Sequence, residues 1–159
     1  MELPTAVQSA IDGTPRFVVH GHLAAYSHWR ALAQDNEPPP FRRFDPIAIP
    51  NLLPSIILFR VHHDPLDFEW RIIGEEVRLR LGGRYAGCRL SALPRQGPGT
   101  RIWQNFERTV QARLPRWGDV AYVGPDKHVR ELQDLILPFH GDDRRIGRLL
   151  VYVEFKRVP

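Results

Sequence analysis

The spacing of apolar side chains predicts a helix near the beginning of the chain, over residues 21–34. Its apolar positions, which fall on one helical face, are Leu23, Tyr26, Trp29, Leu32 and Ala33. Three consecutive prolines at 38–40 cannot continue a helix, so this helix is expected to end before them. The following stretch, 44–54, is apolar but has a proline at every fourth residue from Pro46 onward. That pattern favours short helical turns packed on a surface.

Alternating apolar and polar residues predict a β-hairpin after these turns. Residues 56–62 form a run of β-favouring side chains, and 63–65 supply a turn before a second run at 66–73. In the second run, apolar residues occupy every other position. This strand is therefore expected to have one buried and one solvent-exposed face, as an edge strand does. Its expected buried residues are Leu66, Phe68, Trp70 and Ile72.

The pattern becomes helical again between residues 74 and 113. A short helix is predicted over 74–81, ended by two glycines. A longer helix is predicted from Thr100, a suitable N-cap, to about Arg113, and Pro115 prevents its continuation. The apolar stripe of this helix consists of Ile102, Trp103, Phe106 and Val110.

Three more strands complete the predicted sheet, at 116–123, 129–139 and 146–155. Their short connections make neighbours in sequence neighbours in the sheet. The first and last strands of the chain are apolar on both faces, so both are expected at the centre of the sheet, side by side. The sequence thus predicts an α+β fold with one five-stranded antiparallel sheet in the order 2-1-5-4-3. The helical connector would cover one face of the sheet and the N-terminal helix the other.

Length and composition place these elements in one domain. The chain has 159 residues, 43% of them hydrophobic and 25% charged, which suits a folded chain with a single core. We expect a loosely ordered lead at 1–20, the N-terminal helix with a proline-rich cap at 21–55, and the core at 56–157. The sequence contains no apolar run of about 20 residues and does not begin with a secretory signal pattern. With Cys88 as the single cysteine, a cytoplasmic location without membrane contact is expected.

The net charge of +4 raises the question of nucleic-acid binding. The chain has 22 basic residues against 18 acidic ones, and every basic residue except Lys127 and Lys156 is an arginine. The arginines are spread along the chain with acidic residues between them, and they form no block of five or six like charges. This scatter argues against a nucleic-acid partner. A weak nucleic-acid-binding adaptor remains only as an alternative function.

Short motifs lie in a particular order along most of the chain. They are Trp29, Asp45-Pro46, Ile49-Pro50, Leu52-Leu53-Pro54, the stretch 68–74, Gly83-Arg84 with Gly87, and the stretch 135–139. Together these motifs resemble PAS domains, in particular a subfamily of short stand-alone bacterial PAS-like proteins, over about residues 21–155. The resemblance implies a sensory or protein-interaction module in signalling, with an unidentified small molecule or signalling protein as partner. Cys88 departs from the family pattern, in which arginine follows glycine directly.

The surroundings of Cys88 also bear on cofactors. The segment Cys88-Arg89-Leu90 is similar to the one that forms a flavin adduct in light-sensing PAS relatives. The amides that accompany that cysteine are missing here, because Gly87 precedes it and Ser91 follows Leu90. No flavin adduct is therefore expected. The seven histidines show no spacing that brings three ligands together, so no metal site is expected and haem is disfavoured.

No residue pattern indicates catalysis. Ser55, Ser91 and Cys88 lie in no nucleophile motif, and the glycine-rich stretches do not match a phosphate loop. Asp134 interrupts an apolar strand and is expected to be partly buried, in a structural ion pair with an arginine. The chain is therefore not expected to be an enzyme. A small α+β cavity enzyme of the hydrolase or isomerase class, the other alternative, would need a convergent acid–base pair.

Two groups of residues remain as candidate sites. Aromatic residues on the second strand and the connector would line a small-molecule pocket with an arginine as polar contact, or would simply fill the core. They are Trp70, Tyr85, Trp103, Phe106 and Arg84. The N-terminal helix and the cap carry more apolar surface than one sheet face needs, which predicts a homodimer. The residues of this candidate interface are Leu23, Tyr26, Trp29, Leu52 and Leu53.

Overall fold

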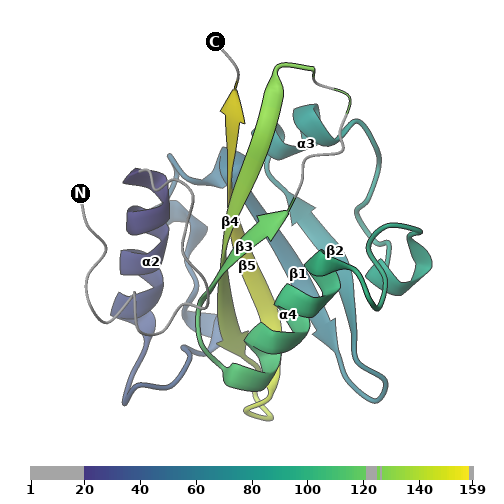
Figure 1. The fold of residues 1–159 in the computed structure, drawn as a ribbon. Coiled ribbons are helices and arrows are strands. Elements are labelled where there is room, and N and C mark those ends of the chain that lie inside the picture. The colour runs from purple at the N-terminus through teal and green to yellow at the C-terminus, as the bar shows by residue number, and fades with distance from the viewer. Residues whose placement is uncertain (1–19, 121–124, 126, 158–159) are drawn as a thin grey trace.

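The computed structural model describes residues 20–120, 125 and 127–157, which form a five-stranded antiparallel sheet with helices on both faces (Figure 1). The strands lie in the order β2-β1-β5-β4-β3. Their bounds are β1 Ile56–His62, β2 Asp67–Ile73, β3 Arg116–Val120, β4 Val129–His140 and β5 Ile146–Arg157. This order confirms the predicted topology.

The helices divide between the two faces of the sheet. Helix α2 (His20–Leu32) packs on one face, where Tyr26 and Trp29 join a buried cluster with strand residues. Helices α3 (Glu75–Leu81) and α4 (Arg101–Ala112) contribute Val77 and Phe106 to a second buried cluster. Figure 1 shows α2 and α4 on opposite sides of the strands. The N-terminal helix thus covers the face that the connector leaves open, as predicted.

The two central strands contribute to both clusters. In β1, Leu58 belongs to the cluster under α2, whereas Ile57 and Phe59 belong to the cluster under α4. Strand β5 repeats this pattern with Leu150 and Val151, which pair with Leu58 and Ile57. All five side chains are at most 6% exposed. Burying each of them stabilises the fold by about 1.5–3 kcal/mol, which is why strands that are apolar on both faces lie at the centre.

The edge strand β2 departs from the predicted alternation. Trp70 is buried on the α4 face, as expected, but Ile72 is 60% exposed. The register explains the difference, because Phe59 pairs with Trp70 and Leu58 with Ile72. Arg71 is therefore an extra residue in a bulge. One inserted residue turns the following side chains to the opposite face, so Ile72 lies on the α2 side of the sheet.

The outer edge of β2 is covered by the connector. The Trp70 N–H donates a hydrogen bond to Cys88 O at 3.0 Å, and the Gly87 N–H donates to Trp70 O at 2.7 Å. An isolated antiparallel bridge between Glu69 and Arg89 continues this contact. Pairing of this kind satisfies backbone groups that would otherwise be open to another chain.

Local capping signals set several element boundaries. The Thr100 hydroxyl accepts a hydrogen bond from the Trp103 N–H at 3.4 Å, which confirms the predicted N-cap of α4. The helix ends at Ala112, and the next residue, Arg113, has a left-handed φ of 58°. In the proline-rich cap, Asp45 accepts from the Ile47 N–H at 2.9 Å and so begins a 3₁₀ turn. The short turns described in the cap are Phe41–Arg43, Pro46–Ala48 and Leu53–Ser55.

Some predictions fall on residues that the structure does not describe. The lead expected at 1–20 lies outside the described residues except for His20, which begins α2. The end of the strand expected at 116–123 also lies outside, since the described part of β3 stops at Val120. Within residues 20–120, 125 and 127–157, no helix has the length and apolar character needed to cross a bilayer.

Candidate functional site

Trp70 and Tyr85, two of the residues predicted to line a ligand pocket, lie together under the α4 face of the sheet. Their rings stack with centres 5.0 Å apart and an interplanar angle of 27°. The Trp70 indole N–H donates a hydrogen bond to Gln96 Oε1 at 2.8 Å. Trp70 is buried and Tyr85 half-buried, whereas Arg84, the predicted polar contact, is exposed. The structure therefore brings the two rings together but leaves the arginine outside.

The other two predicted pocket residues belong to α4. Phe106 lies edge-on to Phe59 and Phe68, with ring centres 4.7 and 5.3 Å apart. Trp103 lies edge-on to Phe68 at 5.1 Å. All four side chains are buried, and edge-to-face pairs contribute about 0.5–1.5 kcal/mol beyond the area that they bury. The contacts described for these rings are thus core contacts, and ligand binding at them stays a prediction.

Of the residues predicted to form a dimer interface, some are buried in the protein and others keep exposed surface. Tyr26 and Trp29 are buried against the sheet. The Trp29 indole N–H donates a hydrogen bond to Pro138 O at 2.7 Å, which attaches α2 to β4. The other three keep exposed surface: Leu23, Leu52 and Leu53. A homodimer through these residues also stays a prediction.

A buried histidine, His22, completes the contact between α2 and the sheet. Its Nε2 lies 3.2 Å from Gln133 O, and because a carbonyl only accepts, this nitrogen carries the hydrogen. Its ring lies edge-on to the rings of Trp117 and Tyr152, with centres 4.7 and 5.1 Å away. Burial lowers the pKa of His22 to about 4, so the ring is neutral at pH 7. The apolar pattern that predicted α2 did not include this residue.

The β1–β2 hairpin carries a polar group that sequence analysis also missed. His62 Nε2 lies 2.9 Å from Glu69 Oε1, and Arg71 donates to Glu69 Oε2 at 2.8 Å. The hydrogen bond from Arg71, followed by that from His62, lowers the pKa of Glu69. This is an acid and a base within hydrogen-bond distance, but neither residue lines either of the two cavities described below. The alternating pattern of the hairpin did not indicate this contact, because His62 and Glu69 are diagonal neighbours across the two strands and not a directly opposed pair.

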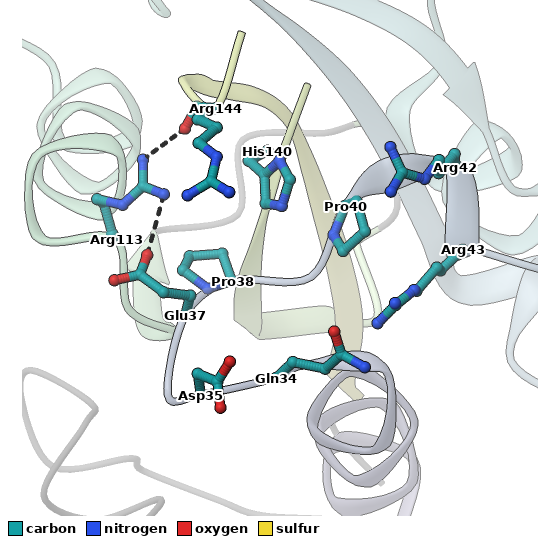
Figure 2. A pocket seen from close by; sticks show the side chains of 10 residues that line it. All are labelled: Gln34, Asp35, Glu37, Pro38, Pro40, Arg42, Arg43, Arg113, His140 and Arg144. Carbon is teal, nitrogen blue, oxygen red and sulfur yellow. Dashed lines mark hydrogen bonds and ion pairs between the residues drawn. The ribbon is translucent and has the colours of Figure 1, made fainter. Parts of the chain in front are cut away.

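A cavity of about 230 Å³ lies where three segments of the chain meet. They are the loop that follows α2, the end of α4, and the turn between β4 and β5 (Figure 2). Its charged lining residues are Arg42, Arg43, Arg113, Arg144, Asp35 and Glu37. Four arginines against two carboxylates make the surface basic. We call this site the arginine-lined cavity.

Hydrogen bonds join the three segments around this cavity. Arg113 donates to Glu37 Oε2 at 3.1 Å and to Arg144 O at 2.9 Å, and so ties α4 to both other segments. The His140 N–H donates to Pro39 O at 3.0 Å, which attaches the loop after α2 to β4. The walls are therefore positioned by the fold itself, as binding sites generally require.

A second hollow, of about 240 Å³, shares part of its wall with the first, including Arg42. Arg148 lines it, and its guanidinium lies over the ring of Phe41, 5.2 Å from the ring centre. Burial, and then the charges of Arg60 and Arg71, lower the pKa of Arg148 from its ordinary value. Arginine nevertheless stays charged at neutral pH, so this hollow extends the basic surface.

The contacts described for Cys88 and Asp134 are with other parts of the fold. Cys88 is half-buried, and its Sγ lies 3.9 Å from Arg84 O. Asp134 is 7% exposed, as expected, and lies opposite Gly118 in the β3–β4 ladder. Its predicted ion pair with an arginine stays a prediction. Among the residues that the structure describes, no three His, Cys, Asp or Glu side chains gather as metal ligands would.

Comparison with known proteins adds one similarity in structure to this picture. No family model matches the chain. No curated protein matches it either. The crystal structure of a sensory box sensor histidine kinase from Vibrio cholerae resembles the chain with a TM-score of 0.49 and 14% sequence identity, over 71% of this chain and 92% of that chain.

Proposed function

We propose that this protein is a non-catalytic sensory module of the PAS type, which acts in signalling by binding a small molecule or a protein. The observation that supports this role is the sheet order 2-1-5-4-3 with a separate helix, α2, on the face that the connector leaves open. A helix attached in this way can change its packing while the core of the domain stays folded.

Among the described residues, hydrogen bonds to β4 and apolar side chains hold α2 in place. Trp29 and His22 donate these hydrogen bonds to the carbonyls of Pro138 and Gln133. A ligand or partner that binds better to one packing of α2 shifts the population toward that packing. We propose that the signal passes through this face of the sheet, because α2 covers it and is attached to it mainly by side chains.

Amide hydrogen exchange tests this mechanism. The amides of α2 should exchange by a local opening, at a lower free energy than those of the central strands β1 and β5. Trp29→Phe removes the hydrogen bond to Pro138 but keeps an aromatic ring, so it should speed exchange in α2 alone. Trp103→Phe, on the other face of the sheet, is the matched control and should leave exchange in α2 unchanged. Exchange of α2 and the strands in one global step would contradict the mechanism.

We further propose that two copies associate through the apolar side chains left exposed around this face. Ile47, Leu53 and Ile72 are 83%, 36% and 60% exposed. Leu53 and Ile72 lie near the same end of the β1–β2 hairpin, since a Cβ on Gly74 would lie 2.3 Å from Leu53 O. Exposed apolar groups of this kind are typical of interaction surfaces.

Native mass spectrometry and sedimentation test the dimer. At tens of micromolar the unmodified protein should be dimeric, and Ile72→Asn should shift it toward the monomer. Leu114→Asn is the control, because Leu114 is also exposed, at 41%, but lies between α4 and β3, away from the β1–β2 hairpin in sequence. A monomeric mass for the unmodified protein at that concentration would refute the dimer.

A further inference from the structure

The arginine-lined cavity gathers more positive charge than its own carboxylates neutralise, since four arginines line it against Asp35 and Glu37. Glu37 is already engaged with Arg113, at 3.1 Å. Arg42 has a long contact of 3.8 Å with Asp142, and with side chains 71% and 100% exposed this pair contributes little. The side chain of Arg144 has no carboxylate partner among the described residues, and it lines the same cavity as Arg113 (Figure 2). Like charges gathered around one cavity repel each other, and a bound anion would offset that repulsion.

Only some of these arginines can be explained by a position at the end of a helix. A helix C-terminus carries a partial negative charge, which favours a nearby arginine. Arg43 fits that role, because it donates to Leu32 O, the last carbonyl of α2, at 3.3 Å. Arg113 also lies at a helix C-terminus, since it directly follows the last residue of α4. Arg42 and Arg144 contact neither helix end in the hydrogen bonds described, so a different explanation is needed for them.

Two residues at the β4–β5 turn, His140 and Arg144, form one wall of the cavity. Arg144 has a φ of 65°, a left-handed conformation in which its carbonyl accepts the hydrogen bond from Arg113. His140 Nδ1 lies 2.7 Å from Gly141 O, so this nitrogen carries the hydrogen. In that tautomer Nε2 carries no hydrogen and only accepts. The donor that this wall offers to an anion is therefore the Arg144 guanidinium.

We propose that this cavity binds a small anion that carries phosphoryl or carboxylate groups, held mainly by Arg42 and Arg144. A guanidinium presents parallel N–H groups that match both kinds of group. The volume of about 230 Å³ lies below the range of about 300–1,000 Å³ for pockets that bury drug-sized ligands. The occupant is thus a small metabolite rather than an extended cofactor. The adjoining hollow with Arg148 gives a second anionic group a place to bind.

The site also connects the anion to α2. Its first wall is the loop that begins just after Leu32, and its other walls belong to α4 and the β4–β5 turn. A bound anion would hold this loop against the core and so slow the opening of α2. That connection rests on the proposed function, whereas the binding itself does not.

Isothermal titration calorimetry of the full chain tests the binding. Inorganic pyrophosphate and citrate are titrated separately in a buffer free of both, so that the two arms distinguish phosphoryl from carboxylate recognition. At least one should bind saturably with one site per chain. Arg42→Gln and Arg144→Gln should each weaken that binding by about tenfold or more, because each removes a charge-assisted contact. Both side chains are exposed, so both variants should fold, which circular dichroism verifies.

Arg78→Gln is the matched control. Arg78 is an exposed arginine on α3 whose guanidinium donates to Glu75 Oε1 at 2.7 Å, outside the cavity. This variant should bind as the unmodified protein does. A loss as large as that of Arg144→Gln would show a general charge effect and overturn the site. Failure of both anions to bind at millimolar concentration would also overturn it, and so would binding of a single-stranded RNA in their place.

Hydrogen exchange with bound pyrophosphate or citrate separates this proposal from the proposed function. Slower exchange in α2 would support both the site and its connection to the helix. Saturable binding with unchanged exchange in α2 would support the site and contradict the connection. Opening of α2 in the free protein together with no anion binding would support the proposed function and overturn the site.

Discussion

His22 makes the stability of the protein depend on pH in a defined direction. Its ring is fully buried between α2 and the sheet, and burial lowers its pKa from 6.5 to about 4. Below pH 6.5 the unfolded chain takes up a proton on this residue, whereas the folded chain does so only near pH 4. The contribution of His22 to the free energy of unfolding is therefore complete above pH 6.5 and is lost as the pH falls toward 4.

The size of this contribution follows from the two pKa values. Their difference corresponds to a loss of about 3 kcal/mol at a pH below both values, and of about 2 kcal/mol at pH 5. The physical cause is the lost hydration of an imidazolium placed against the Trp117 and Tyr152 rings, which the hydrogen bond to Gln133 O offsets only in part. Since domains of this size unfold with about 5–15 kcal/mol, the loss is a large share of the total.

Urea unfolding followed by tryptophan fluorescence, at several pH values from 8 to 5, measures this effect. The reference is His22→Gln, which keeps an N–H donor for Gln133 O but does not titrate. Other groups also cost stability on acidification, because the pKa values of Glu69 and Asp143 are lowered by their arginine partners. They act equally in both proteins, so they cancel in the difference between the two free energies of unfolding.

The advantage of the unmodified protein over His22→Gln should shrink by about 2 kcal/mol between pH 8 and pH 5. His20→Gln is the control, since His20 lies on the same helix with its side chain exposed. Its curve should stay parallel to that of the unmodified protein. If the His22→Gln curve is parallel as well, the buried neutral imidazole does not control the pH dependence and the reasoning is wrong.

Three further predictions concern the free energy of unfolding measured at pH 7. Phe106→Ala should lower it by about 3–5 kcal/mol, because the ring fills the core under α4; a loss below 1 kcal/mol would indicate open space there. Thr100→Ala should cost about 0.5–2 kcal/mol through the lost N-cap, and an unchanged value would contradict the cap. Gly74→Ala should cost about 1–3 kcal/mol, because the new Cβ would lie 2.3 Å from Leu53 O. Gly97→Ala, with its nearest atom at 3.6 Å, should cost clearly less, and equal costs would refute the close approach.

The order of the strands was predictable because burial on both faces leaves a mark in the sequence. A strand covered on two sides needs apolar residues at odd and even positions alike, and β1 and β5 have them. The short connections among β3, β4 and β5 then leave few ways to complete the sheet. The N-cap at Thr100 was readable for a similar reason, since a side chain next to the helix supplies the missing acceptor.

The bulge in β2 was not predictable from the same pattern. The alternation of Phe68, Trp70 and Ile72 is that of a regular strand, and the extra residue, Arg71, has ordinary side-chain chemistry. A bulge is a property of the backbone pairing, and the pairing depends on β1 as well as on β2. For this reason the exposure of Ile72 emerges only when both strands are placed.

The arginine-lined cavity escaped prediction because its residues are far apart in the sequence. Arg42, Arg113 and Arg144 belong to the many arginines spread along the chain, and nothing in their local sequence sets them apart. Only the fold brings the loop after α2, the end of α4 and the β4–β5 turn to one place. His22 escaped for the opposite reason, since a single histidine on a helix gives no sign of burial until the sheet under it is known.

These two features act on the two ends of one helix. His22 lies in the first turn of α2, and the arginine-lined cavity begins just beyond Leu32, its last residue. Between them, Ala25, Tyr26 and Trp29 contribute apolar contacts, which neither a proton nor a small anion changes directly. If solution conditions regulate the packing of α2, they therefore act at its two ends. Acid protonates the buried His22 ring at one end, and the arginine-lined cavity favours an anion at the other.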